Sequence, residues 1–168
     1  MKSTIVIALL ALSLAAAASA QTLCQKGEMD HLSCPTGGGR KILSICSNIE
    51  GSTIDEGSWL QYRFGKPGKI ELAFPEEKTG SISKFEGNYF NPREQPASIA
   101  DLRFTSGGSH YGVTLTSVAS KKGVSAFYGG VSVELGRNRR ISIECDRVDG
   151  PRYFDGFREL NHSLPARK

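Results

Sequence analysis

The side chains that most often carry enzyme chemistry are few in this chain, and none stands at a catalytic or metal-binding spacing. The three histidines are far apart in the sequence, and none has a second metal ligand nearby: His31, His110 and His162. Ser109 and His110 are adjacent, but neighbouring residues on a strand point to opposite faces and do not form a nucleophile–base pair. We therefore expect no catalytic residue, no metal site and no cofactor.

Two carboxylate pairs, Asp55–Glu56 and Glu76–Glu77, are the residues that general acid–base catalysis would use. One carboxyl group of such a pair needs a pKa raised by burial. Both pairs stand in turn-like sequence near glycine or proline, which favours solvated loops. A non-catalytic protein is therefore expected, and an envelope hydrolase that uses these loop carboxylates is an alternative.

A glycine-rich stretch at 37–41 has the composition of a phosphate-binding loop. A P-loop requires Ser or Thr directly after its lysine and a helix to follow. Here Ile42 follows Lys41, and the alternation beyond it indicates a strand. We interpret the stretch as a flexible hairpin loop.

The first twenty residues have the pattern of a signal peptide. Lys2 precedes an apolar run at 5–14, and Ala18-Ser19-Ala20 is a small-x-small cleavage pattern. The run is shorter than the ~20 residues of a membrane span, and Gln21-Thr22-Leu23 is not a lipobox. We expect cleavage after Ala20 and a periplasmic or secreted protein without a membrane span or lipid anchor.

All four cysteines follow that segment, and their even number in an exported chain predicts two disulfides: Cys24, Cys34, Cys46 and Cys145. The formal charge is only +4, which gives no reason to expect nucleic-acid binding. The length is that of one domain. We expect a monomer whose partner is a protein or glycan of the cell envelope.

Period-two alternation of apolar and polar residues predicts short antiparallel strands over most of the chain. In the segment 60–74, both apolar sets must face one side. The tightest pairing puts Phe64 opposite Ile70, with a three-residue loop at 66–68, and places Arg63 opposite Glu71 on the outer surface.

A second hairpin covers residues 100–115, with a two-residue turn at Gly107-Gly108. This turn pairs Phe104 with Tyr111 and places His110 opposite Thr105 on the solvated face. A third hairpin pairs 131–135 with 141–145. Shorter strands are expected at 30–34 and 41–46, with further candidates at 85–90 and 125–128.

These strands predict an all-β domain at 21–148, folded as an antiparallel meander that closes into a small barrel of about eight strands. A two-sheet sandwich is the second possibility. The tail at 149–168 has helix-like apolar spacing and is expected to form a short helix of one or two turns, packed on the domain or mobile.

Closure of the meander brings the first strand beside the last, which predicts a Cys34–Cys145 disulfide. Cys24 and Cys46 are then left for the second bond. Three connectivities are possible for four cysteines, and the alternation around Leu43 and Ile45 leaves the facing of Cys46 open.

Several of these segments together resemble a group of small exported bacterial β proteins. The similarity is carried by Ser33-Cys34, Ser44-Ile45-Cys46, Leu60–Gly68, Glu71–Pro75, Gly130–Val133 and Cys145. It covers most of residues 24–146. No activity is assigned to that group, so the resemblance implies export and a β fold only.

A second resemblance is to the membrane-bound and periplasmic inhibitors of c-type lysozyme, which are small exported β-barrels. Their Ser-Gly-x-basic-Tyr stretch is similar to the segment Ser106, Gly107, Gly108, Ser109, His110 and Tyr111, where His110 replaces the basic residue. Lys121 and Lys122 follow downstream. The resemblance implies that these residues would enter the lysozyme cleft, and it makes lysozyme inhibition an alternative function.

Four aromatic residues carry one further alternative. Phe85, Tyr89 and Phe90, with Tyr128, either pack in the core or form an exposed aromatic platform. Alternation alone leaves both interpretations open.

Overall fold

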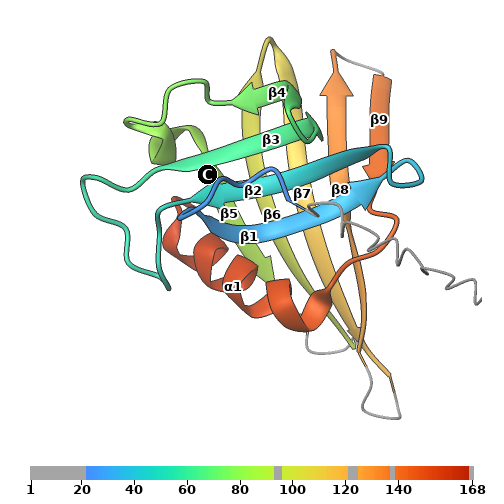
Figure 1. Ribbon diagram of the computed structural model, residues 1–168. Coiled ribbons are helices and arrows are strands. Elements are labelled where there is room, and N and C mark those ends of the chain that lie inside the picture. The colour runs from blue at the N-terminus through green and yellow to red at the C-terminus, as the bar shows by residue number, and fades with distance from the viewer. Residues whose placement is uncertain (1–21, 93–95, 121–124, 137–138, 167–168) are drawn as a thin grey trace, which may run out of the picture.

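The computed structural model describes residues 22–166 apart from 93–95, 121–124 and 137–138. The signal peptide expected at 1–20 thus lies outside the described residues. The described part contains two antiparallel sheets and one α-helix (Figure 1). It contains no helix of the length and apolarity that would cross a membrane.

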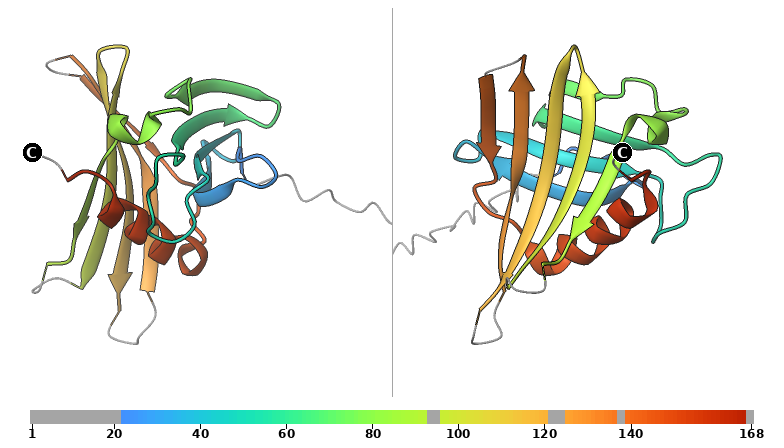
Figure 2. Two further views of the ribbon diagram at one scale, coloured as in Figure 1. Left: turned by 90° about the vertical axis from the view of Figure 1, so that its left-hand side faces the viewer. Right: turned by 180° about the vertical axis from the view of Figure 1, so that it is seen from behind.

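The first sheet has four strands in sequence order: β1 (Met29–Thr36), β2 (Lys41–Ser47), β3 (Leu60–Lys66) and β4 (Lys69–Phe74). The second has five, also in sequence order: β5 (Glu86–Phe90), β6 (Ala97–Ser106), β7 (Ser109–Ala119), β8 (Ser125–Leu135) and β9 (Arg139–Glu144). A 3₁₀ helix, η1 (Ser81–Lys84), precedes β5, and α1 (Gly150–Ser163) follows β9. The strands of the first sheet cross those of the second, and α1 lies beside β1 (Figures 1 and 2).

The expected closed barrel is not found among the described strands, and the two-sheet arrangement fits their pairing. On one side the sheets are joined, because Thr36 bridges Cys145 and the Asp146 amide donates to the Pro35 carbonyl at 2.8 Å. On the other side β5 does not pair with β4. Ala166 forms a parallel bridge to Gly87, so the C-terminal end of the chain occupies the β5 edge that closure would have needed.

The hairpin of β6 and β7 has the register that the sequence predicts. Phe104 pairs with Tyr111, and Thr105 pairs with His110. Gly107 and Gly108 both have positive φ, which a two-residue hairpin turn requires and glycine adopts without strain. The third hairpin and the shorter strands also form, with residues 125–128 as the beginning of β8 and 86–90 as β5.

The register predicted for β3 and β4 is wrong by two residues. Phe64 pairs with Leu72 rather than Ile70, although apolar residues still oppose apolar residues. A bulge opposite Gly65, whose φ is 147°, leaves Glu71 as an extra, unpaired residue of β4 and shortens the turn. A side chain at Gly65 would approach the Lys69 carbonyl oxygen to 2.6 Å, so this bulge requires glycine.

Arg63 is buried rather than exposed opposite Glu71. It pairs with Ala73 across the strands, and its side chain is only 3% exposed. Its guanidinium forms two contacts with the Glu28 carboxylate, at 2.6 and 3.0 Å, and donates to the Leu23 carbonyl at 2.8 Å. The segment before β1 thus covers the outer face of the first sheet, which alternation within β3 could not predict.

Helix α1 is longer than the one or two turns expected, with 14 residues between Asp149 and Leu164. Proline stands at its start and directly after its C-cap, positions that suit the ends of a helix. Its apolar stripe enters the core through side chains at helical spacing: Tyr153, Phe157, Leu160 and Leu164. The helix packs on β1 and on β5 to β8, so it fills space between the sheets.

Both predicted disulfides are present. Cys34–Cys145 joins the first sheet to the end of β9, and Cys24–Cys46 fixes the segment before β1 to β2. The described residues contain no free cysteine. Two disulfides in a β fold agree with an extracytoplasmic protein.

Two buried titratable groups couple the fold to pH. Burial lowers the pKa of His31 to about 4, against the opposing influence of Asp30, and the neutral ring bonds the Ser47 hydroxyl at 2.6 Å. Burial alone would raise the pKa of Glu28, but hydrogen bonds from Arg63, the Gln25 amide and Lys78 lower it to about 2.

We expect the protein to lose stability steadily as the pH falls below 6.5. Between pH 6.5 and 4 the unfolded state binds a proton at His31 that the folded state does not, which costs about 3 kcal/mol in total. Below pH 4.5 Glu28 adds a second loss of the same sign. Urea unfolding at stepped pH measures this, and His31→Gln should flatten the decline between pH 6.5 and 4. An equally steep decline in that variant would contradict the assignment.

Candidate functional site

The face of the second sheet that points away from the core carries the most organised set of polar side chains. In the central strands the alternate residues, such as Leu102 and Val113, are buried in the core, whereas the edge strand β9 has no buried residue. The remaining positions form the outer face. Since the strands are long and in register, this face depends on all five strands rather than on one loop.

The pairing registers arrange the outer face in rows that cross the strands. Three of the rows are polar, and they follow one another from the β6–β7 turn downward: Thr105–His110–Glu134–Arg140, then Glu86–Arg103–Gly112–Ser132–Ser142, then Asn88–Asp101–Thr114–Gly130–Glu144. A fourth row, Phe90–Ile99–Thr116–Tyr128, has an aromatic residue at each end. We refer to these as the three polar rows and the aromatic row.

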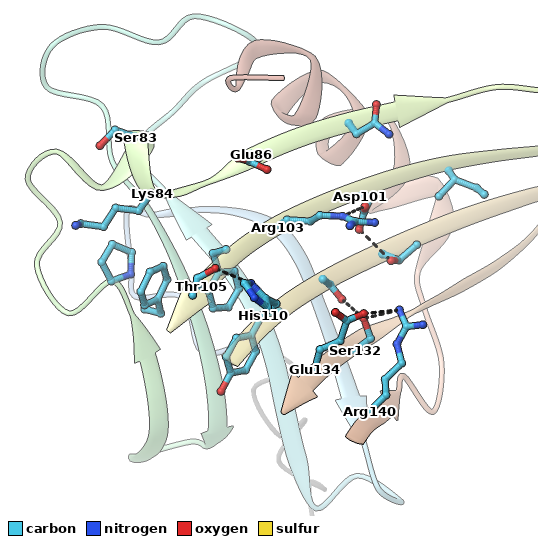
Figure 3. Close-up of a pocket in the computed structure, with 18 of the residues that line it drawn as sticks. Ser83, Lys84, Glu86, Asp101, Arg103, Thr105, His110, Ser132, Glu134 and Arg140 are labelled. Atoms are coloured by element: carbon cyan, nitrogen blue, oxygen red, sulfur yellow. Dashed lines mark hydrogen bonds and ion pairs between the residues drawn. The ribbon is translucent and has the colours of Figure 1, made fainter. Parts of the chain in front are cut away.

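The outer face is hollowed into a groove of about 1140 Å³. Its lining comes from the polar rows and from the segment between β4 and β5, which contributes Glu76, Glu77 and Lys84. Figure 3 shows the labelled side chains of the rows projecting from one side of the strands. A smaller hollow of about 450 Å³ lies beside it and shares Thr114 and Ser132 with it.

Hydrogen bonds and ion pairs hold the groove side chains in place (Figure 3). Arg103 donates from Nε to the Asp101 carboxylate, whose side chain is only 12% exposed, and Thr114 donates to the other Asp101 oxygen at 3.4 Å. Arg140 lies 3.7 Å from Glu134 and donates to the Ser132 hydroxyl at 3.4 Å. These contacts orient donors and acceptors without contributing an apolar contact to the core.

Gly112 forms the floor at the middle of the groove. It sits between Arg103 and Ser132 in the second polar row and has no side chain to fill the space. A Cβ atom there would lie 3.2 Å from the Ser132 hydroxyl and 3.5 Å from Asp101 Oδ1. An alanine therefore fits after a small rotation of Ser132, whereas a larger side chain would occupy the groove.

The structure brings together part of the binding site that the sequence predicts at the turn between β6 and β7. Ser106, Gly107, Gly108, Ser109, His110 and Tyr111 form the tip of the β6–β7 hairpin, with both glycines exposed. His110 lies on the outer face and its Nδ1 bonds the Thr105 hydroxyl at 2.9 Å. Lys121 and Lys122 lie outside the described residues, and β7 runs eleven residues from the turn before ending at Ala119.

The two carboxylate pairs lie in different places. Glu76 and Glu77 line one end of the groove, but both are exposed. Asp55 accepts hydrogen bonds from the Gly57 amide and the Ser58 hydroxyl within its own turn, and Glu56 is exposed. Neither pair shows the burial that general acid–base work requires.

The glycine-rich loop binds a carboxylate of this chain itself. The amides of Gly38 and Gly39 donate to the two Asp146 oxygens at 3.0 and 2.7 Å. These hydrogen bonds lower the pKa of Asp146. The loop thus has anion-binding geometry, and an internal side chain from the end of β9 satisfies it.

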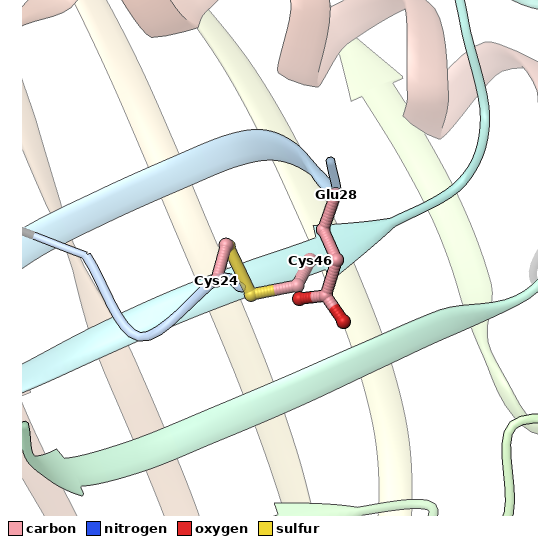
Figure 4. A group of neighbouring side chains, drawn as sticks. All are labelled: Cys24, Glu28 and Cys46. Atoms are coloured by element: carbon pink, nitrogen blue, oxygen red, sulfur yellow. A yellow bond between two sulfur atoms is a disulfide. The ribbon is translucent and has the colours of Figure 1, made fainter. Parts of the chain in front are cut away.

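One cluster contains residue types that metals prefer. Cys24, Glu28 and Cys46 stand together (Figure 4), with their candidate ligand atoms within 4.8 Å of one another. Both sulfurs belong to the Cys24–Cys46 disulfide, so neither is a free thiolate. Glu28 is already paired with Arg63 and Lys78. The cluster holds the segment before β1 against the first sheet.

Sequence reasoning missed the groove but contained a signal for it. The outward members of each alternating strand include Asp101, Arg103, Glu134 and Arg140, and the hairpin patterns identify them as outward. The four aromatic residues, for which the sequence allowed either core packing or an exposed platform, differ in exposure. Phe85 is buried in the core, Tyr89 is half-buried against His162, and Phe90 and Tyr128 are exposed.

The groove is a polar surface to which all five strands of the second sheet contribute side chains. Its described residues include one hydroxyl–imidazole contact, between Thr105 and His110, which is exposed to solvent near the tip of the β6–β7 hairpin. Comparison of the chain with protein-family models, curated proteins and solved structures gave no significant match.

Proposed function

We propose that this is an exported, non-catalytic binding protein whose ligand occupies the outer-face groove. The observation that carries the proposal is the arrangement of the three polar rows: charged side chains are held by one another above a glycine floor and face solvent. In ligand-binding sites, precisely placed polar groups fix the orientation of the ligand and provide specificity.

Export is supported by the signal-peptide pattern at 1–20 and by the two disulfides. The absence of catalysis is supported by the exposure of Glu76 and Glu77 and by the pairing of Asp101 with Arg103. A protein or a glycan of the cell envelope remains the class of partner that an exported chain would meet.

Filling the groove tests this proposal. The chain from residue 21 onward, with its disulfides intact, is immobilised and incubated separately with envelope proteins and with isolated cell-wall glycan. We expect one fraction to be retained, and we expect Gly112→Leu to reduce its retention at least tenfold because the new side chain occupies the floor.

Gly112→Ala is the matched control, since its Cβ fits beside Ser132 and should leave binding unchanged. Ser132→Leu fills the groove from the neighbouring strand and guards against a folding defect specific to position 112. Thermal unfolding of each variant separates loss of fold from loss of binding. Retention that survives both leucine variants would overturn the proposal, and recovery of a chemically altered ligand would favour the hydrolase.

A second candidate, inhibition of c-type lysozyme, is favoured by the exposed turn at Gly107 and Gly108. Glycosidases work through two carboxyl groups in their cleft, and a narrow turn flanked by Ser106 and Ser109 presents hydroxyl groups that can hydrogen bond to them. The rate of cell-wall lysis with excess purified protein tests this candidate. Unchanged lysis would remove it and leave the groove proposal standing.

A further inference from the structure

The aromatic row points to the chemical class of the ligand. Phe90 is 56% exposed and Tyr128 is 62% exposed, and both project from the outer face. The pairings Phe90–Ile99, Ile99–Thr116 and Thr116–Tyr128 place them at the same level on strands that are three apart. At the ordinary spacing of strands, about 14 Å separates them.

Resting on the proposed function, we infer that the outer face binds an uncharged oligosaccharide that crosses the strands and stacks sugar rings on Phe90 and Tyr128. Each exposed ring offers an apolar face to the C–H groups of a sugar. One sugar ring cannot contact both aromatics at their separation, so the site fits a chain of several sugars.

The polar row beside the aromatic row supplies groups that recognise hydroxyls. Asn88, Asp101, Thr114 and Glu144 stand in that row and offer amide, carboxylate and hydroxyl groups. Gly130 lies between Thr114 and Glu144, and a Cβ there would meet the Ile143 carbonyl oxygen at 2.6 Å. This position therefore excludes a side chain, and the smaller hollow, which Gly130 and Tyr128 both line, lies there.

The charges of the face favour an uncharged chain over an anionic one. The polar rows carry four carboxylates, Glu86, Asp101, Glu134 and Glu144, against two guanidinium groups, Arg103 and Arg140. Both guanidinium groups are already paired with carboxylates of the same face. A polyanion would meet net repulsion here, since like charges on one surface oppose its approach.

The apolar content of the face also favours a glycan over a protein partner. The two aromatics stand at the ends of the aromatic row, with half-buried Ile99 and Thr116 between them. Protein interfaces have a contiguous, water-excluding centre with the polar groups at the rim. Here the polar rows fill the centre, and the aromatics lie at one border.

The test uses β-1,4-linked glucose and N-acetylglucosamine oligosaccharides of increasing length, titrated against the mature, oxidised protein by calorimetry. We expect affinity to rise with length until the chain reaches both aromatics, and to change little with salt. Phe90→Ala and Tyr128→Ala should each lower the affinity about tenfold, whereas Tyr128→Phe keeps the ring and should retain binding.

Ile70→Ala is the matched control, because Ile70 is 44% exposed but belongs to the first sheet. Affinity that is unaffected by both aromatic variants but lost in Gly112→Leu would overturn this inference and leave the proposed function intact. Retention of an envelope protein with no affinity for any oligosaccharide would also overturn it. Failure of the leucine variants to affect any binding would overturn both.

Discussion

Replacement of Gly87 by alanine is expected to lower the free energy of unfolding by about 3 kcal/mol or more, as overpacking against rigid neighbours does. Gly87 faces the helix on the inner side of β5. A Cβ atom there would overlap the Asn161 carbonyl oxygen and lie 2.9 Å from the Asn161 Cα. Both are backbone atoms of α1, so no side-chain rotation relieves the overlap.

The same substitution should loosen the C-terminal end of the chain. The Gly87 amide donates to the Pro165 carbonyl at 3.0 Å, and displacing α1 from β5 separates these groups. Urea unfolding measures the stability, and amide exchange at residues 157–166 reports the helix. Gly112→Ala is the control on a neighbouring strand of the same sheet, with an expected change below about 0.5 kcal/mol. Equal stability of the two variants would contradict the packing assigned to Gly87.

Removal of the Cys34–Cys145 disulfide should cost more than removal of Cys24–Cys46. The first links positions 111 residues apart and the second links positions 22 residues apart. In the chain-entropy account a loop near 100 residues contributes about 4.7 kcal/mol, and the shorter loop contributes about 3 kcal/mol. The Cys34–Cys145 bond also lies where the two sheets are joined by backbone pairing, between the end of β1 and the residues that follow β9.

The measurement compares Cys34→Ala/Cys145→Ala with Cys24→Ala/Cys46→Ala by equilibrium unfolding. Alanine suits both pairs because Cys34 and Cys46 are buried, Cys24 and Cys145 are half-buried, and alanine adds no unsatisfied polar group. We expect the first double variant to have the lower midpoint, with a free energy of unfolding lower by about 1–2 kcal/mol. A larger loss in the second variant would mean that the buried Arg63–Glu28 pair depends on Cys24 more than the sheets depend on Cys34.

Local signals predicted the fold well wherever one turn decides the register. The two glycines at 107–108 allow one tight pairing of β6 with β7, and that pairing is found. The register of β3 and β4 was wrong because alternation permits any even shift, and the bulge at Gly65 selected a different one. A bulge depends on contacts across the pair that one strand does not reveal.

Two features depended on segments far apart in the sequence: whether the strands close into a barrel, and whether Arg63 is buried. The barrel was expected because edges are costly, but the edge of β5 is covered by Ala166, which follows its bridge partner Gly87 by 79 residues. Arg63 was expected in solvent because its strand places it outward. Its partner Glu28 comes from the segment before β1, which carries no strand pattern.

The candidate site was predictable residue by residue but not as a surface. Alternation identified Arg103 and His110 as outward-facing, and the structure agrees. The groove exists because five consecutive strands pair in one sheet, which brings Gly112 of β7 next to Ser132 of β8. The order of strands in a sheet is a property of the whole chain, so no local motif could predict the groove.

The separation of the outer face from the core has a consequence for how such a protein can diversify. The polar and aromatic rows use one set of alternating positions, and the core uses the other. Apart from Gly130, whose replacement is sterically blocked, and Asp101, which is buried against Arg103 and Thr114, the row positions can change identity at little expense to folding. A duplicated gene could therefore acquire a different ligand preference through changes in the rows alone, with the two disulfides and the helix-packed interior unchanged.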